Sequence, residues 1–109
     1  MEIVYSNFVD LLLEEGKKSV EEMSQIAVEE FGFPGKKEWI NIIIDMELKD
    51  KEVRKRIKKE DGRYCLSESY DVKKNRDYFL EVFNTAPKDY LEERSYIQKL
   101  KSVLETRRW

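Results

Sequence analysis

The sequence predicts a mainly helical domain that carries one small β-hairpin. Apolar residues recur at helical spacing in three successive segments of the first half of the chain. An Asp-Gly pair then separates two short strand-like runs, and two further helical patterns follow it. With 109 residues and a mass of 13.2 kDa, the chain has the length of one domain with an appendage. We therefore expect a domain in residues 1–68 and a C-terminal helical extension in residues 69–109.

The first helix is expected close to the N-terminus. Val4, Phe8, Leu11 and Leu12 follow the i, i+4, i+7, i+8 spacing of an amphipathic helix. Gly16 should end this helix, because glycine adopts the left-handed backbone conformation of a helix C-terminus without steric cost.

A capping box marks the start of the second helix. Ser19 should accept a hydrogen bond from the Glu22 amide, and the Glu22 side chain should accept one from the Ser19 amide. This helix is expected to run to about Glu30. Residues 31–35 contain two glycines and a proline, so a turn is predicted there.

The third helix is expected from about Lys36 to about Lys49. Three adjacent isoleucines at 42–44 could also form a buried strand, but the length of the pattern and its interspersed polar residues favour a helix. Apolar residues nearly surround it: Trp39, Ile40, Ile42, Ile43, Ile44, Met46 and Leu48. The polar residues left for its open face are Lys37, Asn41, Asp45 and Lys49.

A β-hairpin is predicted next. Asp61-Gly62 suits a type I′ turn, which requires positive φ at both central residues. Side chains alternate between the two faces of a strand, so residues two apart should share a face. One face should carry Ile57, Tyr64 and Leu66, and the other Arg56, Lys58 and Cys65.

Two helices are expected in the extension. Asp71 is placed to cap the first of them, with Val72, Phe79, Val82 and Phe83 on one side.

The last helix should begin at Pro87. Its apolar stripe consists of Tyr90, Ile97, Leu100 and Leu104. We expect this stripe to pack on the rest of the chain. The alternative is a homodimer formed through residues 87–109.

The formal net charge of −2 conceals an asymmetry along the chain. Residues 1–30 carry a net charge of −6, residues 36–63 carry +3 and residues 64–109 carry +1. The local excess of bases in the middle segment is a candidate footprint for a polyanion. Its members are Lys51, Arg54, Lys55, Arg56, Lys58, Lys59 and Arg63.

Residues suited to catalysis are scarce. The chain has no histidine and one cysteine, Cys65, which excludes histidine-based catalysis, histidine metal sites and an internal disulfide. The carboxylates show no nuclease or glycosidase spacing. We therefore expect no enzymatic activity, no catalytic residue, no metal site and no cofactor. No apolar run approaches the roughly 20 residues of a membrane span, so we expect an intracellular protein of the cytoplasm or nucleus without membrane contact.

The predicted order of helix, helix, turn, helix and hairpin is that of a winged helix-turn-helix domain. Residues 3–68 resemble the HARE-type members of the winged-helix superfamily. The matching features are the opening amphipathic helix, GKKSVEE at 16–22, the apolar third helix with Trp39, and GRYCL at 62–66. Such domains occur in the RNA polymerase delta subunit, in some restriction enzymes and in chromatin-associated proteins. The resemblance implies a nucleic-acid-associated or transcription-associated role.

In a winged helix that binds DNA, the third helix enters the major groove and the hairpin contacts phosphates or the minor groove. Asn41 would be the base reader, because an asparagine amide can pair with adenine in a bidentate manner. The candidate contacts with double-stranded DNA are Lys36, Lys37, Asn41, Lys55, Arg56, Lys58, Lys59 and Arg63.

Two functions follow from these residues. The first is a binding module of a transcription or chromatin complex, with DNA contact led by the basic hairpin and largely independent of sequence. The alternative is a protein–protein interaction module of a larger complex that never touches DNA. Glu38, Asp45 and Glu47 favour the alternative, because acids on the third helix repel phosphate. Asn41 is then an ordinary exposed polar residue.

Overall fold

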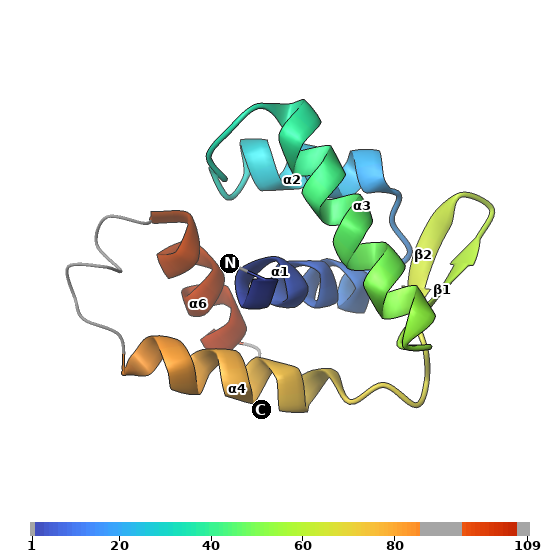
Figure 1. The fold of residues 1–109 in the computed structure, drawn as a ribbon. Coiled ribbons are helices and arrows are strands. Elements are labelled where there is room, and N and C mark those ends of the chain that lie inside the picture. The colour runs from blue at the N-terminus through green and yellow to red at the C-terminus, as the bar shows by residue number, and fades with distance from the viewer. Residues whose placement is uncertain (1, 86–94, 107–109) are drawn as a thin grey trace.

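The computed structural model describes residues 2–85 and 95–106 (Figure 1). Within these residues, five helices and one two-stranded antiparallel hairpin follow the predicted order, which confirms the fold class. The elements are α1 (Glu2–Glu15), α2 (Val20–Glu29), α3 (Lys37–Val53), β1 (Ile57–Glu60), β2 (Arg63–Leu66), α4 (Val72–Asn84) and α6 (Ser95–Thr106).

Helix α1 lies at the centre of the fold. It contacts α3, α4, α6 and β2, with α3 on one side of it and α4 on the other (Figure 1). Its four predicted inward residues are all buried. Gly16 follows the helix at a φ of +145°, as a glycine stop requires.

The capping box of α2 forms as predicted. Ser19 Oγ accepts a hydrogen bond from the Glu22 amide at 3.2 Å, and Glu22 Oε1 accepts one from the Ser19 amide at 3.0 Å. The turn after α2 is also present, and two of its aromatic side chains are buried. Phe33 lies 4.7 Å from Phe8 and 4.9 Å from Tyr96 of α6, measured between ring centroids. This turn therefore joins the last helix to the core around α1.

Helix α3 continues to Val53, about one turn beyond its predicted end at Lys49. It has two faces that both carry apolar side chains. The buried face consists of Ile40, Ile44, Leu48 and Lys51. The exposed apolar residues are Trp39, Ile42, Ile43 and Met46, together with Val53 at the C-terminal end of the helix. The predicted polar open face is therefore wrong in part: Asn41 and Asp45 are half-buried, while five of the ten exposed residues of α3 are apolar.

The hairpin has the predicted turn and register. Asp61 and Gly62 both have positive φ, at 51° and 77°. Ile57 pairs with Leu66 and Lys59 with Tyr64, which confirms that Ile57, Tyr64 and Leu66 share a face. One further contact was not predicted. The segment between α1 and α2 adds a short third pairing, in which Lys18 and Tyr64 exchange two backbone hydrogen bonds of 3.1 and 2.8 Å.

The extension completes the same core. Asp71 caps α4 by accepting a hydrogen bond from the Lys74 amide at 3.1 Å. Phe79 and Phe83 are buried as predicted, whereas Val82 is 37% exposed, against the prediction. Arg76 and Leu80 of the same helix are buried, although neither was predicted to be.

In α6, the expected stripe of Ile97, Leu100 and Leu104 is buried, and the helix contacts α4 and α1. The sequence favoured this packing of the last helix on its own chain. Pro87 and Tyr90 lie outside the described residues.

A buried ion pair connects the two halves of the fold. Lys51 was assigned to the basic surface cluster, but its side chain is fully buried, which corrects that assignment. Its Nζ lies 3.1 Å from Asp10 Oδ1 and donates a hydrogen bond of 2.8 Å to Ser6. Asp10 in turn accepts hydrogen bonds from the Tyr70 hydroxyl at 2.7 Å and from Asn75 at 2.9 Å. Residues of α1, α3, α4 and the segment before α4 thus meet at one charge pair.

We predict that Lys51→Met lowers the free energy of unfolding by about 3–5 kcal/mol, because it leaves the Asp10 carboxylate buried without its cation. Urea denaturation followed by circular dichroism measures the change. Lys49→Met is the matched control: Lys49 lies on the same helix and has a similar acidic partner at i−4, but its side chain is exposed. Equal midpoints for the two variants would contradict a structural role for the buried pair.

Candidate interaction surface

The predicted DNA-contacting residues lie in two separate places. Lys36, Lys37 and Asn41 are at the start of α3, whereas Lys55 and Arg56 follow its last turn. The remaining residues, Lys58, Lys59 and Arg63, are in the hairpin. The 17 residues of α3 span about 24 Å at 1.5 Å per residue. The structure therefore groups the hairpin bases with one another but not with the start of α3.

Half of these polar groups contact a carboxylate. Arg63 donates two hydrogen bonds to Glu22, of 3.0 and 2.7 Å. Lys37 Nζ lies 3.5 Å from a carboxylate oxygen of Glu21, and Asn41 donates to the same carboxylate at 3.5 Å. In addition, Lys58 lies 3.8 Å from Glu60. Asn41 thus turns its amide donor toward α2.

The ion pair with Arg63 also joins the hairpin to the capping box. Glu22 accepts hydrogen bonds from the Ser19 backbone amide and from Arg63. These contacts lower the pKa of the Glu22 carboxyl, the bond from the Ser19 backbone contributing most. At neutral pH the carboxylate is therefore held in its charged form beside the hairpin.

The other bases differ in their surroundings. Lys36 and Lys55 are exposed and contact no carboxylate among residues 2–85 and 95–106. Arg56 lies over the Tyr70 ring and Lys59 over the Tyr64 ring, at 5.2 and 5.6 Å from the centroids. Four of the eight predicted DNA-contacting residues therefore have no direct contact with an acid among the described residues: Lys36, Lys55, Arg56 and Lys59.

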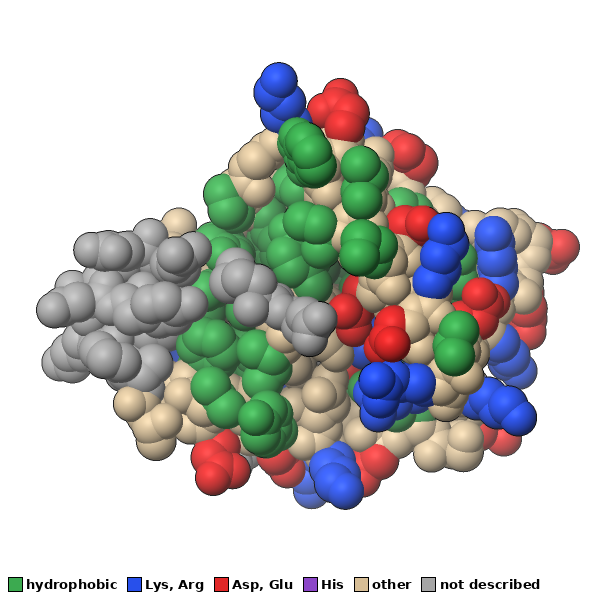
Figure 2. All heavy atoms as spheres, viewed as in Figure 1, with side chains coloured by type: hydrophobic (Ala, Val, Ile, Leu, Met, Phe, Trp, Pro, Cys, Tyr) green, Lys and Arg blue, Asp and Glu red, His purple; other side chains and the backbone are tan. Residues whose placement is uncertain are grey.

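An apolar stripe runs along the outward face of α3. Trp39 is 62% exposed, Ile42 51%, Ile43 38% and Met46 66%. These positions follow the i, i+3, i+4, i+7 spacing with which a helix packs against another element. Figure 2 shows hydrophobic side chains gathered over α3 and again over α4, while the basic side chains gather on the hairpin side. We call these four residues the α3 stripe.

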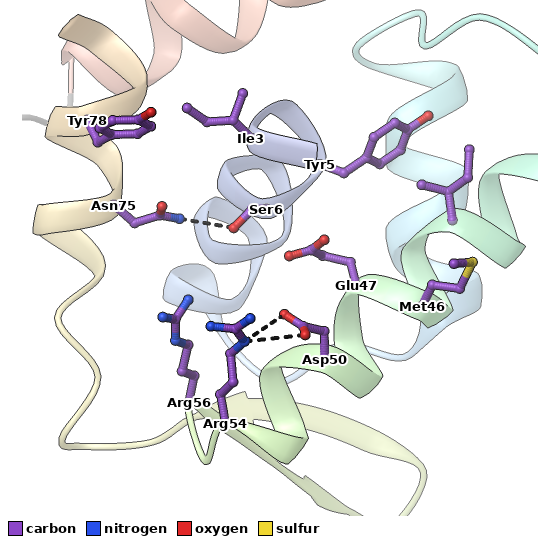
Figure 3. A pocket seen from close by; sticks show the side chains of 11 residues that line it. Ile3, Tyr5, Ser6, Met46, Glu47, Asp50, Arg54, Arg56, Asn75 and Tyr78 are labelled. Atoms are coloured by element: carbon purple, nitrogen blue, oxygen red, sulfur yellow. Dashed lines mark hydrogen bonds and ion pairs between the residues drawn. The ribbon is translucent and has the colours of Figure 1, made fainter. Parts of the chain in front are cut away.

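A groove of about 700 Å³ borders the α3 stripe (Figure 3). Helix α1 lies behind it, and α3 and α4 form its two walls. One end is mainly apolar, and is lined by Ile3, Tyr5, Ile43, Met46 and Tyr78. The opposite end is polar, and is lined by Ser6, Glu47, Asp50, Arg54, Arg56 and Asn75. At this end Arg54 contacts Asp50 at 3.2 Å.

Glu47 is the acid of this groove that lies nearest the buried pair, 3.6 Å from Lys51 Nζ. Burial raises the pKa of the Glu47 carboxyl, because desolvation favours its neutral form, and the neighbouring Asp50 adds to the rise. The positive charge of Lys51 opposes this shift without cancelling it.

The stripe was visible in the sequence only as part of a helix that is apolar nearly all round. Two stripes of helical spacing share α3, and spacing alone does not tell which one faces the core. The buried charge at Lys51 carried no sequence signal either, because it stands within a run of surface bases.

The described part of the chain contains neither a group of metal-ligating side chains nor a helix that could span a membrane. Among residues 2–85 and 95–106, no three His, Cys, Asp or Glu side chains are grouped to hold a metal ion. Within the same residues, no helix has the length and apolar character needed to cross a bilayer. Cys65 is a free, half-buried thiol.

Comparison of the chain with protein-family models, curated proteins and solved structures finds no match.

We predict that Glu47→Gln changes the pH dependence of stability. A carboxyl whose pKa is raised by folding binds its proton more tightly in the folded state. The contribution of the Glu47 carboxyl to the free energy of unfolding is present below its unfolded pKa, near 4.5. It is lost as the pH rises through the raised pKa of the folded state. The parent should therefore lose stability relative to Glu47→Gln as the pH rises above about 4.5, as measured by urea midpoints. The exposed Glu52→Gln on the same helix is the control, and a pH-independent difference for Glu47→Gln would contradict the prediction.

Proposed function

We propose that this protein is a protein-binding module whose docking surface is the α3 stripe. The observation that carries this proposal is the second apolar stripe of α3. It lies outside the core, and three of its four residues are at least half exposed although all four are apolar. Single exposed apolar residues are ordinary, but a contiguous set with helical spacing is typical of an interaction site.

The form of the surface suits an amphipathic helix as the bound element. A helix that packs against another helix presents apolar residues at i, i+3, i+4 and i+7, which is the spacing of the α3 stripe. The groove beside it adds apolar walls from Tyr5 and Tyr78, and tyrosine and tryptophan are the residues that most often anchor interfaces.

The surroundings of the hairpin also favour a protein partner. Arg63, Lys37 and Lys58 each contact a carboxylate, so a phosphate would have to compete with an acid already in place. A DNA-facing α3 would also have to bury Trp39 and Met46 against the polar edges of bases.

A displayed peptide library tests this function. Random 16-residue peptides on phage would be selected on the parent chain, immobilised sparsely. We expect enriched peptides with apolar residues at i, i+3 or i+4, and i+7. Binding should fall at least about tenfold for Met46→Lys, because a charge would then stand in the contact surface.

The matched control is Val28→Lys, which places the same charge at a residue of α2 that is 38% exposed and outside the groove. Peptides that bind Met46→Lys as tightly as the parent, or no enrichment at all, would remove the α3 stripe as the docking surface.

Duplex DNA is a second candidate partner. It is favoured by Lys55 and Lys59, which are exposed without an acidic contact among the described residues. The exposed Lys58 lies between them in the sequence, although it also contacts Glu60. Such contacts reach phosphates and position a protein without reading sequence.

Fluorescence anisotropy of a labelled generic duplex tests this second function. Three phosphate contacts would weaken binding roughly fortyfold between 50 and 200 mM salt, because bound counterions are released. Replacing Lys55, Lys58 and Lys59 by Ala should abolish the binding at 50 mM. The same replacement of Lys73, Lys74 and Lys101, outside the hairpin, is the control. If the hairpin variant binds like the parent, the hairpin is not a DNA-binding surface.

A further inference from the structure

We infer that the occupant of the α3 stripe is a second copy of this chain, docked with its own α3 antiparallel to the first. The inference rests on the proposed function, because it names the partner of the same surface. It differs from the dimer considered from the sequence, which used the last helix. The apolar residues of α6 are buried within the chain, whereas those of the α3 stripe are exposed.

The first argument is the symmetry of the α3 stripe. Trp39 and Met46 lie at its ends, and Ile42 and Ile43 lie at its middle. A two-fold axis through the point between residues 42 and 43 would place Trp39 against Met46 of the other copy. Ile42 and Ile43 lie on opposite sides of the stripe, so each would lie beside its own counterpart in the other copy. The large indole then faces a flexible thioether, and the branched side chains face each other, so the surface complements itself.

The second argument is the charge on the two edges of the α3 stripe. On a helical wheel of about 100° per residue, Glu38 and Lys49 fall on one edge of the stripe. Asp50 and the N-cap residue Lys36 fall on the other side of its midline. All four residues are exposed. In an antiparallel pair related by a two-fold axis, each edge meets the same edge of the other copy. Glu38 then lies beside the partner copy's Lys49, and Lys36 beside its Asp50, with an axial offset of at most about 3 Å.

These contacts extend pairs that already exist within the helix. Lys49 contacts Asp45 at 2.9 Å, and Asp50 contacts Arg54 at 3.2 Å. Lys36 contacts no carboxylate among the described residues, so the second copy supplies it with one. One side of the dimer would therefore carry Asp45, Lys49 and the partner copy's Glu38 in a row of alternating charge. The other side would carry Arg54, Asp50 and the partner copy's Lys36. Each row occurs twice by symmetry, and together they set the register.

The antiparallel orientation follows from the rest of the chain. The basic residues Lys55, Lys58 and Lys59 all come after the C-terminal end of α3. A parallel pair would bring two such groups to the same end, where they repel. The antiparallel pair separates them by the length of α3, and it also aligns the two helix dipoles favourably.

Analytical ultracentrifugation of the full chain between about 10 µM and 1 mM, in 50 mM salt, tests the inference. We expect a reversible monomer–dimer equilibrium. Met46→Lys should weaken dimerisation at least about tenfold, while Val28→Lys should leave it unchanged. A parent that is monomeric at 1 mM overturns the inference, as does a dimer that Met46→Lys leaves intact.

Charge reversal tests the register and orientation. Glu38→Lys or Lys49→Glu alone should weaken the dimer roughly fivefold, because each repels at two symmetry-related places. The double variant should recover most of the lost affinity, since the two Glu38–Lys49 pairs between the copies are then present with their signs exchanged. The Lys49–Asp45 contact is lost within each copy, in the monomer and the dimer alike. In a parallel dimer these residues would face other partners, and failure of the double variant to recover overturns the antiparallel arrangement.

The peptide selection separates this inference from the proposed function. A monomeric parent that still enriches α3-stripe-dependent peptides retains the function and loses the homodimer. A parent that neither dimerises nor enriches peptides loses both.

Discussion

The buried ion pair between Lys51 and Asp10 determines how the rest of the molecule is arranged. It lies where α1, α3 and α4 meet, and Ser6, Tyr70 and Asn75 form hydrogen bonds with its two members. Lys51 is on the same face of α3 as Ile44 and Leu48. Holding its ammonium group at Asp10 therefore fixes the rotation of α3 about its own axis. With that rotation fixed, one apolar stripe enters the core and the other is left facing outward.

A charge pair of this kind orients more than it stabilises. Removing two charges from water is costly, and their attraction offsets that cost only when the remaining lone pairs and protons are satisfied. Two apolar stripes of similar length compete for the core on α3, and hydrophobic burial alone distinguishes them poorly, because it has no direction. The single buried ammonium group breaks this near-equivalence, since only one rotation brings it to a carboxylate. The position of the outward α3 stripe thus follows from a polar contact on the opposite side of the helix.

Local signals in the sequence were sufficient for most of the fold. The Ser19–Glu22 capping box, the Asp61-Gly62 turn and the Asp71 cap are decided by residues close together in the chain, so their structures follow from short-range chemistry. Predictions failed where a distant residue decides the outcome. Lys51 reads as a surface base until Asp10, forty-one positions earlier, is placed beside it. The exposed face of α3 could not be predicted for the same reason, and the neutralisation of Arg63 by Glu22 depends on how the hairpin packs against α2.

The hairpin is held on both strands, which has a consequence for its motion. Lys17 contacts Glu60 of β1 at 2.6 Å, Arg63 of β2 contacts Glu22, and the backbone of Lys18 pairs with Tyr64. A hairpin attached only by its two ends would swing on the nanosecond-to-microsecond timescale of loops. This one is fastened to the connection between α1 and α2, so it moves with that connection as one body. Any molecule that touches the hairpin therefore meets a surface that is already ordered, and little conformational entropy is lost when contact is made.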